Sequence, residues 1–331
     1  MIDGLASGMT QQGTPSAVDP QARALLDRIA ALNRPPIDTL PLDEIRALFE
    51  EMFTRLGGPP PAVGKVVEVT APGPRGSIPI RVYTPEGAPE ARPLFVYFHG
   101  GGWVCGSRDS YDSVCRLLTR ESGCVVASVD YRRAPEHPAP EPFEDCYAAF
   151  EWLAAHAADL GADGSRLAIG GDSAGGGLAA GVALKARDAS GPKIAHQLLI
   201  YPAVGGGVTR SESYRLYSEG YLLTADRIAF YDRCHVPRRE LADDPYVFAA
   251  RAETLRGLPP ATLIFAECDP IRDEGLKYAD RLRADGVPVE VRVYPGMIHA
   301  FFSFIDIFDQ GREAVIYAGR SVGKALGAVV A

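Results

Sequence analysis

A serine flanked by glycines is the first candidate for chemistry in this sequence. The segment Gly171-Asp-Ser173-Ala-Gly175 has the pattern G-x-S-x-G, between a short apolar run, Arg166–Ile169, and a stretch of small residues reaching Lys185. Strand, sharp turn and helix is the context in which this pattern exposes a nucleophilic serine. The turn also leaves the backbone N–H of Ala174 at a helix N-terminus, facing a developing oxyanion. Because the chain has 35 glycines, the pattern also arises by chance, and catalysis needs further support.

A nucleophilic serine needs a base and an acid that orients the base. Among six histidines only His299 follows the last predicted strand, so we predict it to be the base. Asp269 directly follows the preceding predicted strand and is the predicted acid. Asp273 and Glu274 instead open a helix, where acidic residues suit the helix dipole anyway. The chain order of Ser173, Asp269 and His299 is the one expected of α/β hydrolases.

A glycine run after the third predicted strand supplies a candidate oxyanion hole. The sequence there is Phe98-His-Gly-Gly-Gly-Trp103, and successive glycines let backbone N–H groups turn inward without a side-chain clash. We predict Gly101 and Gly102 as donors alongside Ala174. Loss of one such donor typically lowers the rate by about 10²–10³. His99 is predicted to support this loop by a hydrogen bond.

The same glycines could instead cradle a phosphate. The phosphate-binding pattern G-x-x-x-x-G-K-[ST] is absent from the sequence. The dinucleotide-binding pattern G-x-G-x-x-G, aligned from Gly100, has Cys105 in place of its third glycine. A G-x-G-x-x-A match from Gly175 falls inside the helix predicted after Ser173. His99 has no partner at metal-ligand spacing. The sequence therefore predicts neither a cofactor nor a metal.

Alternating strand-like and helix-like segments predict the framework that positions these residues. From the third strand onward helices separate the strands, which predicts an eight-stranded, mostly parallel sheet flanked by helices. The first two strands are close together and predict an antiparallel pair. In such sheets the site lies at the carboxyl ends of the strands. The predicted strands are Lys65–Thr70, Ile78–Tyr83, Leu94–Phe98, Val125–Val129, Arg166–Ile169, Gln197–Tyr201, Thr262–Ala266 and Val289–Tyr294.

Two regions outside this alternation predict a helical cap. Helices are expected at Pro20–Asn33 and Asp43–Leu56, from apolar residues at helical spacing. These helices could simply pack on the domain, or they could cover a substrate pocket. The aromatic-rich stretch 205–257 is too long for a loop and favours the second interpretation. We therefore predict N-terminal cap helices in 1–60 and a catalytic domain in 61–331, with 205–257 as a cap insertion.

Composition excludes several classes of protein. The 331 residues carry a net charge of −8 and no basic run, which argues against a nucleic-acid partner. Residues 1–20 lack the features of a secretory signal, and no apolar run approaches the length of a membrane span. The six cysteines form no C-x-x-C pair and read as reduced thiols. We predict a cytoplasmic location.

Together the motifs resemble the hormone-sensitive-lipase-like branch of the α/β hydrolases, which includes many bacterial carboxylesterases. The resemblance implies the α/β-hydrolase fold, a cap, Ser173 as nucleophile with Asp269 and His299, and the three oxyanion donors. One departure is Arg133, where an apolar residue is commoner. The motifs that carry the resemblance are His99–Trp103, Asp130–His137, Gly171–Gly175, Asp269–Gly275 and Gly296–Phe301.

The predicted function is a serine carboxylesterase that hydrolyses short- to medium-chain acyl esters through an acyl-enzyme. The expected partner is a small-molecule ester, and the resemblance makes a homodimer plausible. Three alternatives stay open, one of which is a purely structural or scaffolding domain. The same machinery could act on a lactone, an amide or an acetyl group. The chain could also be a catalytically silent binding protein, although the presence of His299 disfavours this.

Overall fold

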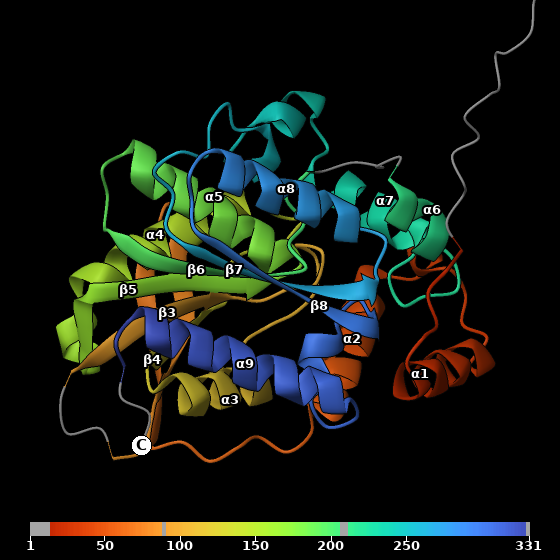
Figure 1. Cartoon of the computed structure of the whole chain (residues 1–331), viewed down its shortest axis with the longest axis horizontal. Helices are drawn as coiled ribbons and strands as arrows, with labels where there is room; N and C mark the ends of the chain where they lie inside the picture. The colour runs from red at the N-terminus through yellow and green to blue at the C-terminus, as the bar shows by residue number, and fades with distance from the viewer. Residues whose placement is uncertain (1–13, 88–90, 206–210, 329–331) are drawn as a thin grey trace, which may run out of the picture.

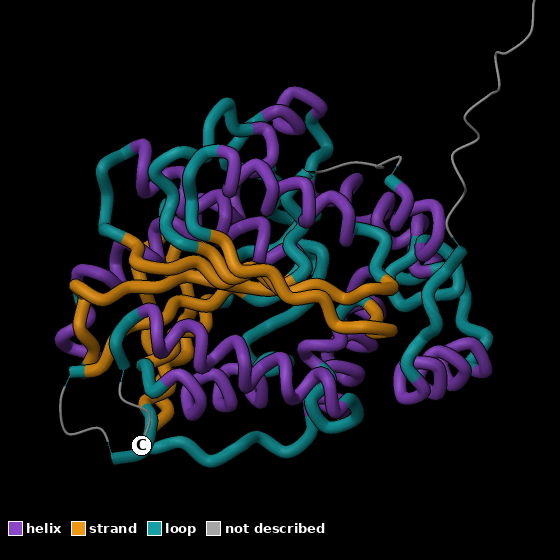
Figure 2. The backbone as a smooth tube through the Cα atoms, in the orientation of Figure 1, coloured by secondary structure: helices purple, strands orange, loops and turns teal. Residues whose placement is uncertain are grey.

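One eight-stranded sheet forms the centre of the molecule (Figures 1 and 2). The computed structural model describes residues 14–87, 91–205 and 211–328. The spatial order of the strands is β1-β2-β4-β3-β5-β6-β7-β8. Their bounds are β1 Lys65–Gly73, β2 Gly76–Thr84, β3 Arg92–Phe98, β4 Val125–Val129, β5 Ala162–Asp172, β6 Ile194–Ile200, β7 Ala261–Cys268 and β8 Val289–Ile298.

The strand directions confirm the predicted mixed sheet. β2 runs antiparallel to both β1 and β4, and every other neighbouring pair is parallel. Several strands extend beyond the predicted segments. β8 continues through Pro295 and Gly296, where the pairing with β7 shifts register between Ala266 and Cys268. A proline and a glycine normally end a strand, so the sequence pattern ended β8 too early.

Helices cover both faces of the sheet, as predicted for strands that alternate with helices (Figure 1). α3 and α9 pack together on one face, and α4, α5 and α8 lie on the other. The last helix, α9, ends before Gly327, which has φ 62°. The bounds are α3 Asp112–Ser122, α4 Glu141–Ala155, α5 Ala174–Asp188, α8 Arg272–Ala284 and α9 Asp309–Ala325.

Four further helices gather beside one end of the sheet (Figure 1). The long connection between β6 and β7 contains helices α6 and α7, and α1 and α2 lie beside them. Residues 1–13 and 206–210 of the two predicted cap regions lie outside the described residues. The bounds are α1 Pro20–Ala31, α2 Leu42–Gly57, α6 Glu212–Tyr217 and α7 Ala225–His235.

Candidate active site

Ser173 occupies the sharp turn between β5 and α5. Its φ is 53°, a left-handed conformation that non-glycine residues rarely adopt. The flanking glycines are required by close packing, because a Cβ on Gly175 would lie 2.0 Å from the carbonyl oxygen of Phe98. A Cβ on Gly171 would lie 2.3 Å from the same oxygen. The predicted strand, turn and helix are therefore present, and the strained turn holds the serine at its apex.

The structure brings the three predicted catalytic side chains into one hydrogen-bonded chain. Ser173 Oγ lies 2.9 Å from His299 Nε2, and His299 Nδ1 lies 2.7 Å from Asp269 Oδ2. Because a carboxylate only accepts, Nδ1–H donates to Asp269 and leaves Nε2 to accept from the serine hydroxyl. Asp269 is fully buried, and its other oxygen accepts the backbone N–H of Ile271. This arrangement suits abstraction of a proton from Ser173.

The other acidic residues near the end of β7 have different partners. Asp273 accepts the backbone N–H of Ser213, and Glu274 accepts that of Gly205. Both therefore tie the segment after β6 to α8. Burial raises the pKa of Glu274 to about 7. Asp269 is the residue that reaches the imidazole, in agreement with the choice made from the sequence.

The glycine loop after β3 lies beside Ser173. Gly101 and Gly102 have φ values of 117° and 61°, which suit glycine. Within residues 14–87, 91–205 and 211–328, their backbone N–H groups donate no hydrogen bond. Ala174 is the first residue of α5, where N–H groups lack an intrahelical acceptor. These three predicted donors are available to an oxyanion.

A buried carboxylate that the sequence analysis did not single out anchors this loop. Asp172 accepts the Gly100 N–H and the hydroxyls of Tyr97 and Tyr111, each at 2.9 Å. Burial raises the pKa of Asp172, and the two tyrosine hydroxyls partly offset this by stabilising the anion. An aspartate inside an otherwise apolar and glycine-rich strand end was the available signal. His99 adds the predicted support, with Nδ1 2.8 Å from the carbonyl oxygen of Gly100.

A small cavity of about 60 Å³ lies over Ser173. Side chains of α2 and of the segment that leads into α7 form its outer wall. The α2 helix is held in place by Arg46, which donates to the carbonyl oxygens of Val104 and Ala134 and to both oxygens of Glu136. The cavity lining includes Gly101, Gly102, Ser173, His299, Phe49, Met52, Phe53, Leu222, Arg227 and Tyr231.

Metal ligands, membrane-spanning helices and disulfides are considered next for the described residues. No group of three or more His, Cys, Asp or Glu side chains there could hold a metal ion. In the same part of the chain, every helix is too short or too polar to cross a membrane. All six cysteines are free thiols, and five of them are buried.

Known proteins place this geometry in a family. A family model described as the alpha/beta hydrolase fold matches residues 95–303. The chain belongs to this family. The esterase LipI of Mycobacterium tuberculosis is 40% identical over 253 residues, which cover 76% of this chain and 79% of LipI. The carboxylic ester hydrolase LipN of the same organism is 42% identical over 248 residues, 73% of this chain and 65% of LipN.

Solved structures agree with these relatives. An esterase from Pyrobaculum calidifontis matches with a TM-score of 0.87 and 39% identity, covering 94% of this chain and 100% of that chain. An ester hydrolase from the metagenome of Lake Arreo, in complex with a bipyridine phosphonate derivative, matches with a TM-score of 0.90. It is 39% identical, and the match covers 94% of this chain and 99% of that one. The predicted fold, the resemblance to hormone-sensitive-lipase-like hydrolases and the enzyme class, a carboxylic ester hydrolase, are confirmed.

Proposed function

We propose that this protein hydrolyses short- to medium-chain carboxylic esters, with Ser173 as nucleophile, His299 as general base and Asp269 as its orienting acid. The observation that carries the proposal is the continuous chain from Ser173 Oγ through His299 to Asp269, with donor–acceptor distances of 2.9 and 2.7 Å. The neighbouring relatives named as esterases support the same chemistry.

The reaction follows from the positions of these atoms. Ser173 Oγ attacks the ester carbonyl while Nε2 of His299 accepts its proton, and Asp269 stabilises the resulting imidazolium. The developing oxyanion accepts hydrogen bonds from the N–H groups of Gly101, Gly102 and Ala174. The imidazolium then protonates the leaving alcohol, which leaves an acyl-enzyme on Ser173. Water, activated by His299, repeats the sequence and releases the acid.

The enclosed site favours small esters. We assign the helices of 1–60 and the insertion 205–257 to a cap, because Met52 of α2 and Tyr231 of α7 both line the cavity over Ser173. A cavity of about 60 Å³ next to the nucleophile suits a short acyl group, and a longer chain has to continue past the cap residues. A cytoplasmic location, expected from the sequence, and a homodimer, which only the family resemblance implies, stay predictions.

A p-nitrophenyl ester series from acetyl to dodecanoyl, hydrolysed by the wild type and by Ser173→Ala, tests this function. We expect activity to peak at short or medium chains and kcat to fall by about 10⁴–10⁶ in the variant. A small loss in Ser173→Ala would refute the assignment of the nucleophile. Labelling of Ser173 by a fluorophosphonate without ester hydrolysis would indicate a different acyl substrate. Absence of both would favour a binding protein.

A further inference from the structure

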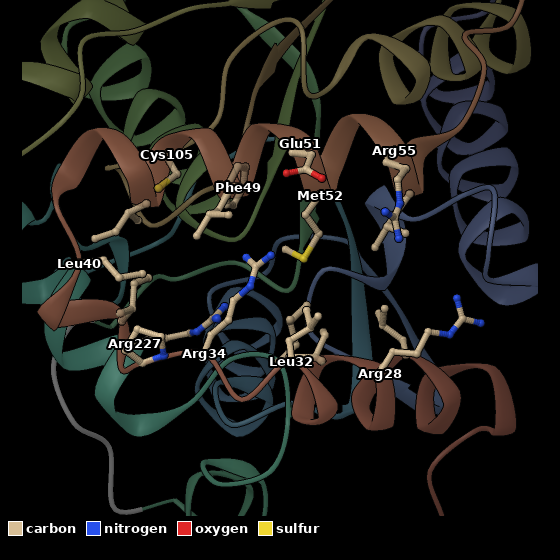
Figure 3. A pocket seen from close by; sticks show the side chains of 18 of the residues that line it. Arg28, Leu32, Arg34, Leu40, Phe49, Glu51, Met52, Arg55, Cys105 and Arg227 are labelled. Carbon is tan, nitrogen blue, oxygen red and sulfur yellow. The ribbon is translucent and has the colours of Figure 1, made fainter.

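A second, larger chamber adjoins the cavity over Ser173. It has a volume of about 280 Å³ and lies between α1, α2 and α7 (Figure 3). The two spaces share a wall formed by Phe49, Met52, Leu222, Arg227 and Tyr231. The distal end of a substrate whose carbonyl lies at Ser173 would enter this chamber by passing between these side chains.

Most of the chamber wall is apolar and suits a methylene chain. Burial of such a chain contributes roughly 0.8 kcal/mol per CH₂. The aliphatic side chains come from α1, from α2 and from the segments that connect them to the rest of the fold. They include Leu25, Ile29, Ile37, Leu48, Met52 and Leu222.

The charged groups of the chamber are mainly cationic. Four arginines, Arg28, Arg34, Arg55 and Arg227, line it together with one acid, Glu51. The whole chain carries a net charge of −8, so this excess of positive charge is local. Among the residues that the structure describes, none of these arginine side chains forms an ion pair or a hydrogen bond.

Two of these arginines, the exposed Arg34 and the half-buried Arg227, extend into the space between the helices. Figure 3 shows the guanidinium groups of Arg34 and Arg227 in the space between α1 and α2, whereas Arg28 points to the outer edge. Like charges that line one space repel, and because Arg34 is exposed and Arg227 is half-buried, water screens part of this repulsion. An anion placed between them would remove this cost and accept charge-assisted hydrogen bonds.

Helix stability does not explain the position of Arg227. It lies in the first turn of α7, which begins at Ala225 with Thr224 as its N-cap. The helix dipole disfavours a cation there by typically 0.3–1 kcal/mol at an exposed site. The residue is half-buried and lines both cavities. Its position places a cation in the walls of both cavities.

We propose that the chamber binds the carboxylate-bearing end of an ester substrate, with Arg227 and Arg34 as specificity-determining residues. This inference rests on the proposed ester hydrolysis at Ser173. Both kinds of substrate that fit the chamber have an apolar spacer between the reacting ester and a terminal carboxylate. The carboxylate can belong to the acyl part, as in a dicarboxylic acid monoester, or to the alcohol part, as in an acylated ω-hydroxy acid.

Matched substrate pairs test the proposal. The acyl pair is mono-p-nitrophenyl suberate and the same ester with a methylamide in place of the carboxylate. The alcohol pair is ω-acetoxyhexanoate and its methylamide, and hydrolysis of this pair is measured by the release of acid. We expect kcat/KM to favour the anionic member of at least one pair by about tenfold, which corresponds to about 1.4 kcal/mol. The pair that shows the preference identifies which part of the ester enters the chamber.

Variants assign the preference to the two arginines. Arg227→Gln and Arg34→Gln should each lower the anionic-to-neutral ratio about fivefold, and Arg227→Glu should invert it. Raising the salt concentration from 0.1 to 1 M should lower the ratio, because the Debye length shrinks from about 10 to about 3 Å. Arg23→Gln is the control, since Arg23 lies on α1 outside the chamber, with its side chain 51% exposed.

Two failures can be distinguished. Equal hydrolysis of both members of both pairs would overturn this inference and leave the esterase function intact. A preference that persists unchanged in the Arg227→Gln/Arg34→Gln double variant would also overturn it. Failure to hydrolyse even the neutral esters, with no fluorophosphonate labelling of Ser173, would refute the proposed function and this inference with it.

Discussion

The substitution Gly102→Ala tests how the cap and the oxyanion loop depend on each other. Gly102 has φ 61°, and a Cβ built on it would lie 2.3 Å from the ring of Tyr231 on α7. Alanine therefore introduces two costs. One is the left-handed backbone, about 1–2 kcal/mol for a residue with a Cβ. The other is the overlap with a ring that helps to close the cavity over Ser173.

The size of the displacement follows from the contact distance. Ordinary contact of a Cβ begins at 3.4 Å, so the loop and the ring must separate by about 1.1 Å to lengthen the 2.3 Å contact to that distance. Misplacement of catalytic groups by about 1 Å costs on the order of 10²-fold in rate. Loss of one oxyanion donor costs about 10²–10³ in kcat. We therefore expect kcat of Gly102→Ala to fall by about 10²–10³.

The assay is hydrolysis of p-nitrophenyl butyrate together with urea denaturation. Gly161→Ala is the matched control, because Gly161 has φ 70° and open space where the Cβ would lie. Gly161→Ala should lower the free energy of unfolding by about as much as the backbone cost in Gly102→Ala, because its alanine is also left-handed. Its kcat should stay within about twofold of the wild type, because no side chain is displaced. Tyr231→Ala combined with Gly102→Ala should regain about tenfold in kcat, as double-mutant cycles detect contacts of this kind. Retention of kcat within about threefold in Gly102→Ala would refute the reasoning.

Two further predictions concern buried groups beside the site. Burial lowers the pKa of His235 to about 3, so the folded protein keeps this imidazole neutral while the unfolded chain binds a proton below about pH 6.5. The wild type should therefore lose free energy of unfolding when the pH falls from 7 to 4.5. His235→Phe keeps an aromatic ring to stack on Trp103 and should reduce this loss by about 3 kcal/mol, measured by urea titrations. An unchanged loss in the variant would contradict the assignment. Burial also raises the pKa of the Cys105 thiol to about 12, so at pH 8 iodoacetamide should leave Cys105 unmodified until the protein unfolds. The modification is measured by mass spectrometry. Rapid labelling of Cys105 in the native protein would contradict the prediction and would show that the chamber wall opens.

The sequence by itself determined the framework and the order of the reacting residues. Apolar runs separated by helical segments predicted all eight strands, and each predicted catalytic residue follows a strand end. Local patterns were sufficient because a strand, a tight turn and a helix N-terminus are set mainly by neighbouring residues. The same reason explains the early end given to β8, since local rules take Pro295 and Gly296 as a stop while pairing with β7 continues.

Only the tertiary structure decided which side chains surround the reacting groups. Asp172 is unusual in its apolar, glycine-rich strand end, but its role could not be read from that position, because its partners Tyr97 and Tyr111 lie elsewhere in the sequence. The chamber that contains Arg34 and Arg227 forms where α1, α2 and α7 meet, although α7 lies far along the chain. Contacts of this kind depend on how whole elements pack against one another, and no spacing within a single segment encodes them. The proposed chemistry was therefore readable from the sequence, and the shape and charge of the proposed substrate site were set by the fold.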